Sequence, residues 1–466
     1  MMNCLHRLLL LRALLQALLQ AFLQGLPQAL PRALLQTLAL ALPLAALPVG
    51  AARAQDAAAP PAAAQATPIT PITPTTPTTP TAPATPATPT APAMPAMPAM
   101  PATPVPQATA ASARVFPTTP QRRPDGRKWR IGYLESGDYT EYPRTLRVIV
   151  AGLQQLGWVK VADMPEGLTG HQMWQFLADH AKSDTLEFVA DAWWQPGNFE
   201  ASKRPAVRQA ITDRLRNKHD IDLIIAMGTL AGQDMAALGA PVPTIVASTS
   251  DAVGARIVKS VQDSGLDNLH ARVQPERYQR QVRLFHDIVP FKTLGIVYED
   301  SPEGRTYSAV DAVEQVAKEQ QFKVVSCDAR ANGIELKAAT ENVLNCYRQI
   351  AGKADAIYVT VHRGITPDSV AEVARIVRDA KIPTFSMLGS DEVKKGVLMS
   401  LAQADYSYVG LFYAETMARI FNGALPRQLN QVWIDPAKIA LNLQTARTIG
   451  FDPPVDILLA ADEVYE

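Results

Sequence analysis

Polar side chains gather at the end of one apolar segment, at residues 242–251 (VPTIVASTSD). The first six residues have the composition of a buried strand, and Ser248, Thr249, Ser250 and Asp251 follow them directly. Ser, Thr and Asp commonly cap helices, but one helix start needs only one capping side chain. Three hydroxyls and a carboxylate in a row therefore favour a ligand-binding site.

Similar residues follow other strand-like segments. In open parallel sheets the ligand lies outside the carboxyl ends of the strands, and the helices that begin there offer free backbone amides to an anionic group. We therefore predict a site in which the first half of the chain supplies one side and the second half the other. The predicted ligand-binding residues on this basis are Glu135, Thr229, Ser248, Thr249 and Asp251, opposed by Glu299, Thr360 and His362.

Short apolar runs alternate with amphipathic helical stretches from residue 127 onward. One series contains RIGYL, LEFVADAWW, DLIIAMG and PTIVAST, and a second contains TLGIVYE, FKVVSCD, AIYVTV, PTFSML and VLMSLAQA. Continuous apolar strands separated by helices are typical of parallel sheets covered on both faces. About 340 residues exceed what one core usually holds, so we predict an α/β fold with two doubly wound parallel-sheet lobes.

Catalytic and nucleic-acid signatures are not found in this sequence. It contains no G-x-S-x-G, GxxxxGK[ST] or H-E-x-x-H motif, and its cysteines and histidines lack metal-ligand spacing. The 44 basic and 44 acidic residues balance, and no basic recognition module is present. The sequence predicts a binding protein, not an enzyme, with no metal, no cofactor and no nucleic-acid partner.

The N-terminal part differs in composition from the rest. Residues 1–54 are rich in Leu, Ala and Gln, and Ala52-Arg53-Ala54 has the form of an export cleavage site. We expect cleavage after Ala54 and a periplasmic location; an uncleaved membrane anchor is the alternative. Residues 55–125 are rich in Pro, Thr and Ala, which predicts a disordered, semi-extended spacer. The spacer is either a functional stalk or a tolerated expansion.

Two cysteines, Cys327 and Cys346, follow the spacer. An oxidising compartment would permit a disulfide between them. However, Cys327 ends a predicted strand and Cys346 lies late in the next predicted helix, which would separate them along the sheet. We therefore expect two buried thiols.

The region from Trp129 to Glu466 resembles the tryptophan/tyrosine-type (TrpX-like) family of ABC transporter substrate-binding proteins. The stretches that carry the resemblance are DLIIAMGTLAGQ (222–233), IVASTSDAVGARIVKSV (245–261), TLGIVYEDSPEG (293–304), ADAIYVTVHRGIT (354–366) and the closing segment 439–466. The resemblance implies a type I periplasmic-binding-protein fold, a small-molecule ligand and a membrane permease as partner. Three places depart from the family pattern: Ala252, the segment LDNLHARV (266–273), and residues 163–185.

The resemblance also implies a chain path. The first lobe would comprise residues 126–252 plus 405–432, and the second 253–404 plus 433–466, with a multi-strand hinge near 251–275, 402–406 and 430–436. This path adds Asp405 to the predicted ligand-binding residues, at the mouth of the cleft beside Glu135.

These features together predict a monomeric, extracytoplasmic solute-binding protein of an ABC importer. Two lobes would close by hinge motion on a small, amino-acid-like ligand. The first alternative is a periplasmic sensor that signals to a membrane partner, and the second is an α/β enzyme.

Overall fold

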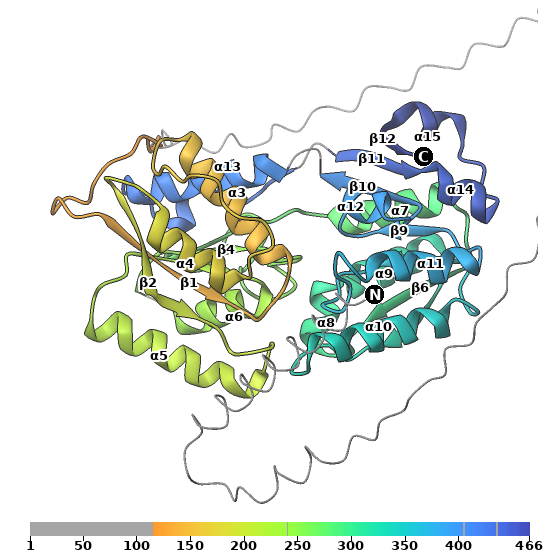
Figure 1. Ribbon diagram of the computed structural model, residues 1–466, viewed down its shortest axis with the longest axis horizontal. Coiled ribbons are helices and arrows are strands. Elements are labelled where there is room, and N and C mark those ends of the chain that lie inside the picture. The colour runs from red at the N-terminus through yellow and green to blue at the C-terminus, as the bar shows by residue number, and fades with distance from the viewer. Residues whose placement is uncertain (1–114, 240, 404–405, 435–436) are drawn as a thin grey trace, which may run out of the picture. The chain divides into compact units, whose positions relative to one another are not determined.

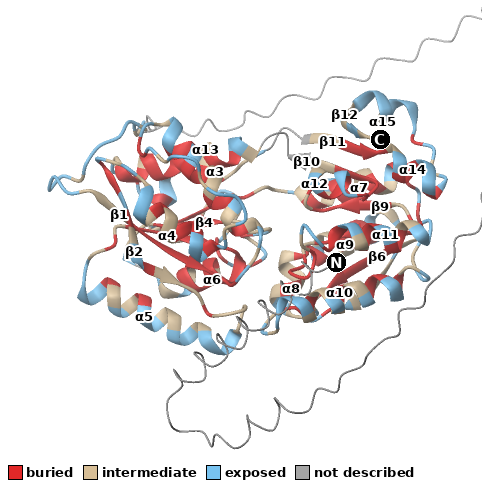
Figure 2. Cartoon of the chain, viewed as in Figure 1, coloured by how far each residue is buried: buried red, intermediate tan, exposed pale blue. Residues whose placement is uncertain are grey.

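The computed structural model describes residues 115–239, 241–403, 406–434 and 437–466 (Figure 1). The first lobe contains a parallel sheet in the order β2-β1-β3-β4-β5. Its strands are β1 (Trp129–Glu135), β2 (Leu186–Trp194), β3 (Leu223–Met227), β4 (Thr244–Ala247) and β5 (Leu269–Ala271). β3 and β4 are buried at every position because helices and loops cover both faces (Figure 2).

The helices of the first lobe come from two distant parts of the chain. They are α3 (Glu141–Gln155), α4 (Gly170–His180), α5 (Arg204–Asn217), α6 (Thr229–Leu238) and α13 (Tyr406–Phe421), with a short turn at Ala201–Lys203. α3 and α13 lie side by side in Figure 1 although more than 250 residues separate them in sequence. Two glycines permit this contact, because a Cβ at Gly152 would lie 2.7 Å from the Gly410 carbonyl oxygen.

The second lobe contains a seven-stranded sheet in the order β12-β11-β10-β9-β8-β6-β7. Its strands are β6 (Thr293–Tyr298), β7 (Lys323–Asp328), β8 (Ala356–Val359), β9 (Thr384–Ser386), β10 (Met399–Gln403), β11 (Ala437–Asn442) and β12 (Ala461–Tyr465). Its helices are α7 (Arg277–Ile288), α8 (Pro302–Tyr307), α9 (Val310–Gln320), α10 (Leu336–Ile350), α11 (Val370–Asp379), α12 (Ser390–Lys394), α14 (Leu443–Ile449) and α15 (Val455–Ala460).

The prediction of two doubly wound α/β lobes is confirmed, and both lobes share one strand order. β6 to β10 repeat the arrangement of β1 to β5, with the first strand between the second and the third. In this order the crevice for a ligand opens between the first and third strands, here between β1 and β3 and between β6 and β8. The second sheet is not wholly parallel, because β11 pairs antiparallel to β10. β10 leads toward the first lobe and β11 returns from it, which requires opposite directions.

Several predicted boundaries differ from the structure. β5 belongs to the first sheet, so the chain enters the second lobe after residue 271 and not at 253. A β-bridge between Val273 and Val432 brings two of the predicted hinge segments side by side. The segment after Asp251 forms turns and no helix, which removes the helix start we expected there.

The end of the predicted spacer packs on the first lobe. Trp158 Nε1 donates to the Thr118 carbonyl at 2.8 Å, and Asn422 Nδ2 donates to the Thr119 carbonyl at 3.1 Å. Residues 115–125 are therefore part of the folded unit, contrary to the prediction of a spacer that extends to 125. The predicted signal segment and the rest of the spacer lie outside the described residues.

The expectation of two free thiols is wrong, because Cys327 and Cys346 form a disulfide with a Cα–Cα distance of 5.5 Å. α10 begins beyond the carboxyl end of the sheet, where Thr340 Oγ1 donates to the carbonyl of Gly364, a residue that follows β8. Ten residues at about 1.5 Å each bring the helix back by about 15 Å. This places Cys346 level with the end of β7, whereas we had assumed that the helix starts at the strand end.

In the part of the chain that the structure describes, no helix is both long and apolar enough to cross a membrane.

Candidate functional site

A cavity of about 1270 Å³ lies at the carboxyl ends of both sheets. Loops from both switch points line it. After β1 and β3 these loops and the helices that follow them contribute Ser136, Tyr139, Tyr142 and Thr229, and after β6 and β8 they contribute Tyr307, Val361 and Arg363. Both lobes therefore line the same cavity, at the position where open α/β sheets bind ligands.

Three of the predicted site residues line this cavity together: Thr229, Ser248 and Thr249. The Thr229 and Thr249 hydroxyls are 3.3 Å apart, and Ser248 adopts a φ of 54°, in the left-handed region. Gly228 precedes the helix with a φ of 95°, and a Cβ there would overlap the Tyr142 hydroxyl. Strands β3 and β4 pair in register, which explains why their polar ends meet.

The start of α6 presents backbone amides to the cavity. The N–H of Ala231 donates to Ser136 Oγ at 3.0 Å, and that of Gly232 donates to the Gly228 carbonyl at 3.0 Å. The first amides of a helix have no intrahelical acceptor, which leaves those of Thr229 and Leu230 beside the cavity that both residues line. This helix start favours an anionic or carbonyl group of a ligand.

Asp251 stabilises its own turn. Its Oδ1 accepts from the amides of Val253 at 3.0 Å and Gly254 at 2.8 Å. The side chain is exposed and does not line the cavity.

Glu135 is buried behind the cavity wall in the first lobe. Its carboxylate accepts from Tyr133 Oη at 3.0 Å, Trp193 Nε1 at 3.2 Å and Gln195 Nε2 at 2.9 Å. Burial raises its pKa to about 7, although these three donors oppose the shift. Glu135 does not line the cavity; it joins β1 to β2 and the residues that follow β2.

Glu299 holds a loop of the second lobe. Its Oε2 accepts from the amides of Ala331 at 2.8 Å and Asn332 at 2.7 Å, and its Oε1 accepts from Asn332 Nδ2 at 3.2 Å. This positions the loop 329–335, from which Asn332 lines the cavity. Glu299 thus acts on the cavity wall through Asn332.

Thr360 and His362 both face the interior of the second lobe, and each is only 1% exposed. The Thr360 hydroxyl donates to the Val297 carbonyl. His362 Nε2 lies 2.7 Å from the Ala329 carbonyl, while Nδ1 accepts from the Gly364 amide at 3.0 Å, so hydrogen bonding fixes the proton on Nε2. Burial lowers the pKa of His362 to about 4.

Two neighbouring residues line the cavity instead. Val361 lies between Thr360 and His362, and Arg363 directly follows His362. Side chains of an extended segment alternate between two directions, and our prediction selected the set that faces inward.

Asp405 lies outside the described residues. Its neighbour Tyr406 lines the cavity and donates to or accepts from Thr145 Oγ1 at 2.8 Å. Arg144 lies over the Tyr406 ring at 4.8 Å and pairs with Asp391 of the second lobe at 2.7 Å.

The aromatic wall of the cavity was not among the predicted site residues. Tyr139 and Tyr142 pack edge to face at 5.3 Å, and Tyr142 and Phe199 have ring centroids 6.3 Å apart. Tyr307 lines the cavity from the second lobe. Tyr142 follows β1 by only seven residues, so its place near a switch point could have indicated it; Phe199 gave no such signal.

Several contacts join the two lobes beside the cavity. The Gly333 amide donates to the Asn198 carbonyl at 2.7 Å, and Arg363 Nε donates to the Asp138 carbonyl at 3.4 Å. Both of these second-lobe residues come from loops at carboxyl ends of strands. A group bound in the cavity would therefore contact loops that already meet.

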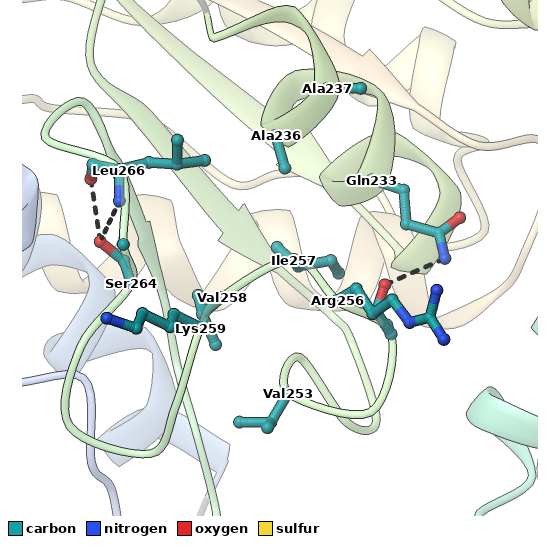
Figure 3. Close-up of a pocket in the computed structure, with 12 residues that line it drawn as sticks. Gln233, Ala236, Ala237, Val253, Arg256, Ile257, Val258, Lys259, Ser264 and Leu266 are labelled. Atoms are coloured by element: carbon teal, nitrogen blue, oxygen red, sulfur yellow. Dashed lines mark hydrogen bonds between the residues drawn. The ribbon is translucent and has the colours of Figure 1, made fainter.

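A second hollow, of about 660 Å³, lies between α6 and the loop 253–266 (Figure 3). Its wall includes the apolar side chains of Ala236, Ala237 and Leu266, and Gln233 Nε2 donates across it to the Ala255 carbonyl at 3.2 Å. Residues of the first lobe alone form it, and neither switch point contributes. We therefore take the larger cavity as the candidate site.

Among the described residues, no group of three or more His, Cys, Asp or Glu side chains is arranged to hold a metal ion.

Comparisons with known proteins agree with this geometry. A family model described as ABC transporter substrate binding protein matches residues 196–465. The tyrosine-binding protein of Clostridioides difficile (strain R20291) is 24% identical over 296 residues, which cover 61% of this chain and 79% of that protein.

Two solved structures are similar in fold. A conserved domain protein of Vibrio cholerae aligns with a TM-score of 0.55 at 20% identity and covers 72% of this chain and all of its own. The ABC domain from Streptococcus pneumonia, solved in complex with L-Trp, aligns with a TM-score of 0.53 at 21% identity and covers 72% of this chain and 99% of its own.

Proposed function

From the premise that this chain belongs to the family of ABC transporter substrate-binding proteins, we propose that its cavity binds a small aromatic amino acid or a close analogue. Membership of this family makes the chain an extracytoplasmic solute-binding protein that serves an ABC importer through a membrane permease, and not an enzyme. The identity of the ligand is the part we propose.

The observation that carries the proposal is the composition of the cavity wall at the two switch points. Tyr142 and Phe199 present rings from the first lobe and Tyr307 presents one from the second, which suits a flat apolar group. The hydroxyls of Thr229 and Thr249 and the start of α6 suit polar groups at the other end of such a ligand. The names of the tyrosine-binding relative and of the L-Trp complex are in line with this chemistry.

Within the site we retain Thr229, Ser248 and Thr249 as ligand contacts. Binding would stabilise the state in which the two lobes meet, and the permease would read that state. We also propose that the protein works as a periplasmic monomer and that export removes residues 1–54.

A thermal-shift series with L-tyrosine, L-tryptophan and L-leucine, followed by calorimetry, tests the proposed ligand. A ligand at about a hundred times its dissociation constant should stabilise the protein by about 2.7 kcal/mol. Phe199→Ala should weaken binding of the aromatic amino acids, whereas Thr448→Ala, at an exposed position of α14, should not. Equal stabilisation by L-leucine, or none by either aromatic amino acid, would contradict the proposal.

A further inference from the structure

Arg363 is a buried cation in the wall of the cavity. It follows β8, at the switch point of the second lobe, and is only 6% exposed. Thr229 follows β3, the equivalent strand of the first lobe, and lines the same cavity. The two switch points thus contribute a helix start from one lobe and a guanidinium from the other.

The hydrogen bonds of Arg363 go to neutral acceptors. Nη1 donates to the carbonyls of Ala331 at 3.0 Å and Ile334 at 2.8 Å, and Nε donates to the Asp138 carbonyl of the first lobe at 3.4 Å. Its guanidinium lies over the Phe199 ring at 5.6 Å. Nη2 makes no hydrogen bond to any described residue.

Arg363 has no carboxylate within 4.0 Å in the described part of the chain, unlike Arg144 and Arg147, which line the same cavity. Arg144 pairs with Asp391 at 2.7 Å, and Arg147 pairs with Glu166 at 3.7 Å. A buried charge without an opposite charge destabilises a protein unless a partner arrives. Burial accordingly lowers the pKa of Arg363 from its usual value.

The carboxylates whose electrostatic attraction raises the pKa of Arg363 are Asp138, Glu299 and Glu335. Asp138 Oδ1 accepts from Gln195 Nε2 at 3.0 Å, and the Glu299 carboxylate accepts from the amides of the loop 329–335. None of these three carboxylates lies within 4.0 Å of the guanidinium. The protein thus holds a cation beside an aromatic ring in the cavity without a close counter-charge.

We propose that Arg363 binds the carboxylate of the ligand. This inference rests on the proposed function, which it deepens by naming the residue that requires an anionic group. The Phe199 ring beneath the guanidinium places an aromatic contact next to this anion site. Because Arg363 already contacts the Asp138 carbonyl of the first lobe beside the cavity, a carboxylate bound to it would strengthen the contact between the lobes.

The test compares Arg363→Gln with Arg147→Gln. Both changes remove one arginine charge from the same cavity, but Arg147 has a carboxylate partner. Each protein is titrated by calorimetry with L-tyrosine and with tyramine, which keeps the ring and the ammonium but lacks the carboxylate. Wild type and Arg147→Gln should bind L-tyrosine at least about tenfold more tightly than tyramine. Arg363→Gln should lose that difference.

A measurement with acetate distinguishes failure of the proposed anion site from failure of the proposed ligand. Acetate should raise the melting temperature of the wild type and of Arg147→Gln above that in equimolar chloride, and should leave Arg363→Gln unchanged. This result would support the anion site even if no protein bound L-tyrosine, in which case only the proposed ligand would fail. Retained discrimination in Arg363→Gln, or an acetate response equal in all three proteins, would overturn the inference.

Labelling of the wild type covers the case in which Arg363→Gln does not fold. Phenylglyoxal modification, read by peptide mass spectrometry, should be slower at Arg363 in acetate than in chloride and the same at Arg147 in both. Equal rates at Arg363 in the two salts would contradict the proposal.

Discussion

Glu299 and His362 stabilise one loop of the second lobe from two sides. Glu299 accepts from the amides of Ala331 and Asn332, and His362 contacts the Ala329 carbonyl. The loop they hold presents Asn332 to the cavity and Gly333 to the first lobe. Both residues therefore affect the cavity through the loop 329–335.

His362 should make the folded state sensitive to acid. Its pKa of about 4 in the folded protein lies below the ordinary value of 6.5. Between these values the unfolded state binds the additional proton, so stability is present above pH 6.5 and is lost as the pH falls toward 4. The contribution is of order 3 kcal/mol.

Urea denaturation at pH 7.5, 6, 5 and 4.5 measures this effect. His362→Gln keeps a donor and an acceptor without a titrating group, and it should lose less stability across this range than the wild type. His180→Gln, at an exposed position, should follow the wild type. Identical pH profiles for His362→Gln and the wild type would show that His362 does not carry the linkage.

Two contacts between elements fix the architecture of the lobes. α3 and α13 approach closely enough to require glycine at both sides of the contact, and the disulfide joins the end of β7 to α10. The first contact attaches a late helix to the first lobe. The second fixes α10, whose first residues lie beside the loop 329–335.

Gly410→Ala should destabilise the protein by about 1–3 kcal/mol. A Cβ at this position would overlap the Val148 carbonyl of α3, whereas helix propensity alone would favour alanine by up to about 1 kcal/mol. Urea denaturation measures the sign of the change. Gly352→Ala is the control, because a Cβ there meets nothing within 4 Å; a stabilised Gly410→Ala variant would contradict the close packing.

Removal of the disulfide should lower the free energy of unfolding by about 3 kcal/mol, because the bond closes a loop between residues 19 apart in sequence. Thermal unfolding of the wild type with and without a reductant measures this loss. Cys327→Ala/Cys346→Ala should match the reduced wild type and should not respond to the reductant. A response of the double variant would point to an effect of the reductant elsewhere.

Several direct contacts join the two lobes beside the cavity. The ion pair between Arg144 and Asp391 crosses between α3 and α12, and the Gly333 amide and the Arg363 guanidinium donate to carbonyls of the first lobe. Arg144 is 45% exposed and Asp391 is 70% exposed. Such exposed pairs contribute up to about 1 kcal/mol, so this ion pair adds little to the closed state.

Asp391→Asn should therefore weaken ligand binding by no more than about fivefold. The effect should fade as salt concentration rises, because screening already weakens the exposed pair. Calorimetry at low and high salt measures both features. Asp379→Asn removes an exposed partner of Arg375 within the second lobe and should leave the affinity unchanged. A hundredfold loss of affinity in Asp391→Asn would contradict the small contribution assigned to this ion pair.

The fold class and the strand ends at which the cavity forms were predictable from local sequence patterns. Apolar strands that alternate with helices are typical of parallel sheets covered on both faces, as in doubly wound folds, and Thr229, Ser248 and Thr249 follow strands that pair in register. Local patterns were sufficient for these features because each depends on a single segment and its neighbour.

Which polar residues reach the cavity depends on how distant segments pack together. Near a strand end, one residue of difference reverses the direction of a side chain, so His362 faces the interior and Arg363 faces the cavity. Glu135 and Glu299 accept hydrogen bonds from groups far away in sequence, and the disulfide depends on where α10 begins relative to the sheet. These outcomes follow from long-range packing, which composition and periodicity do not encode.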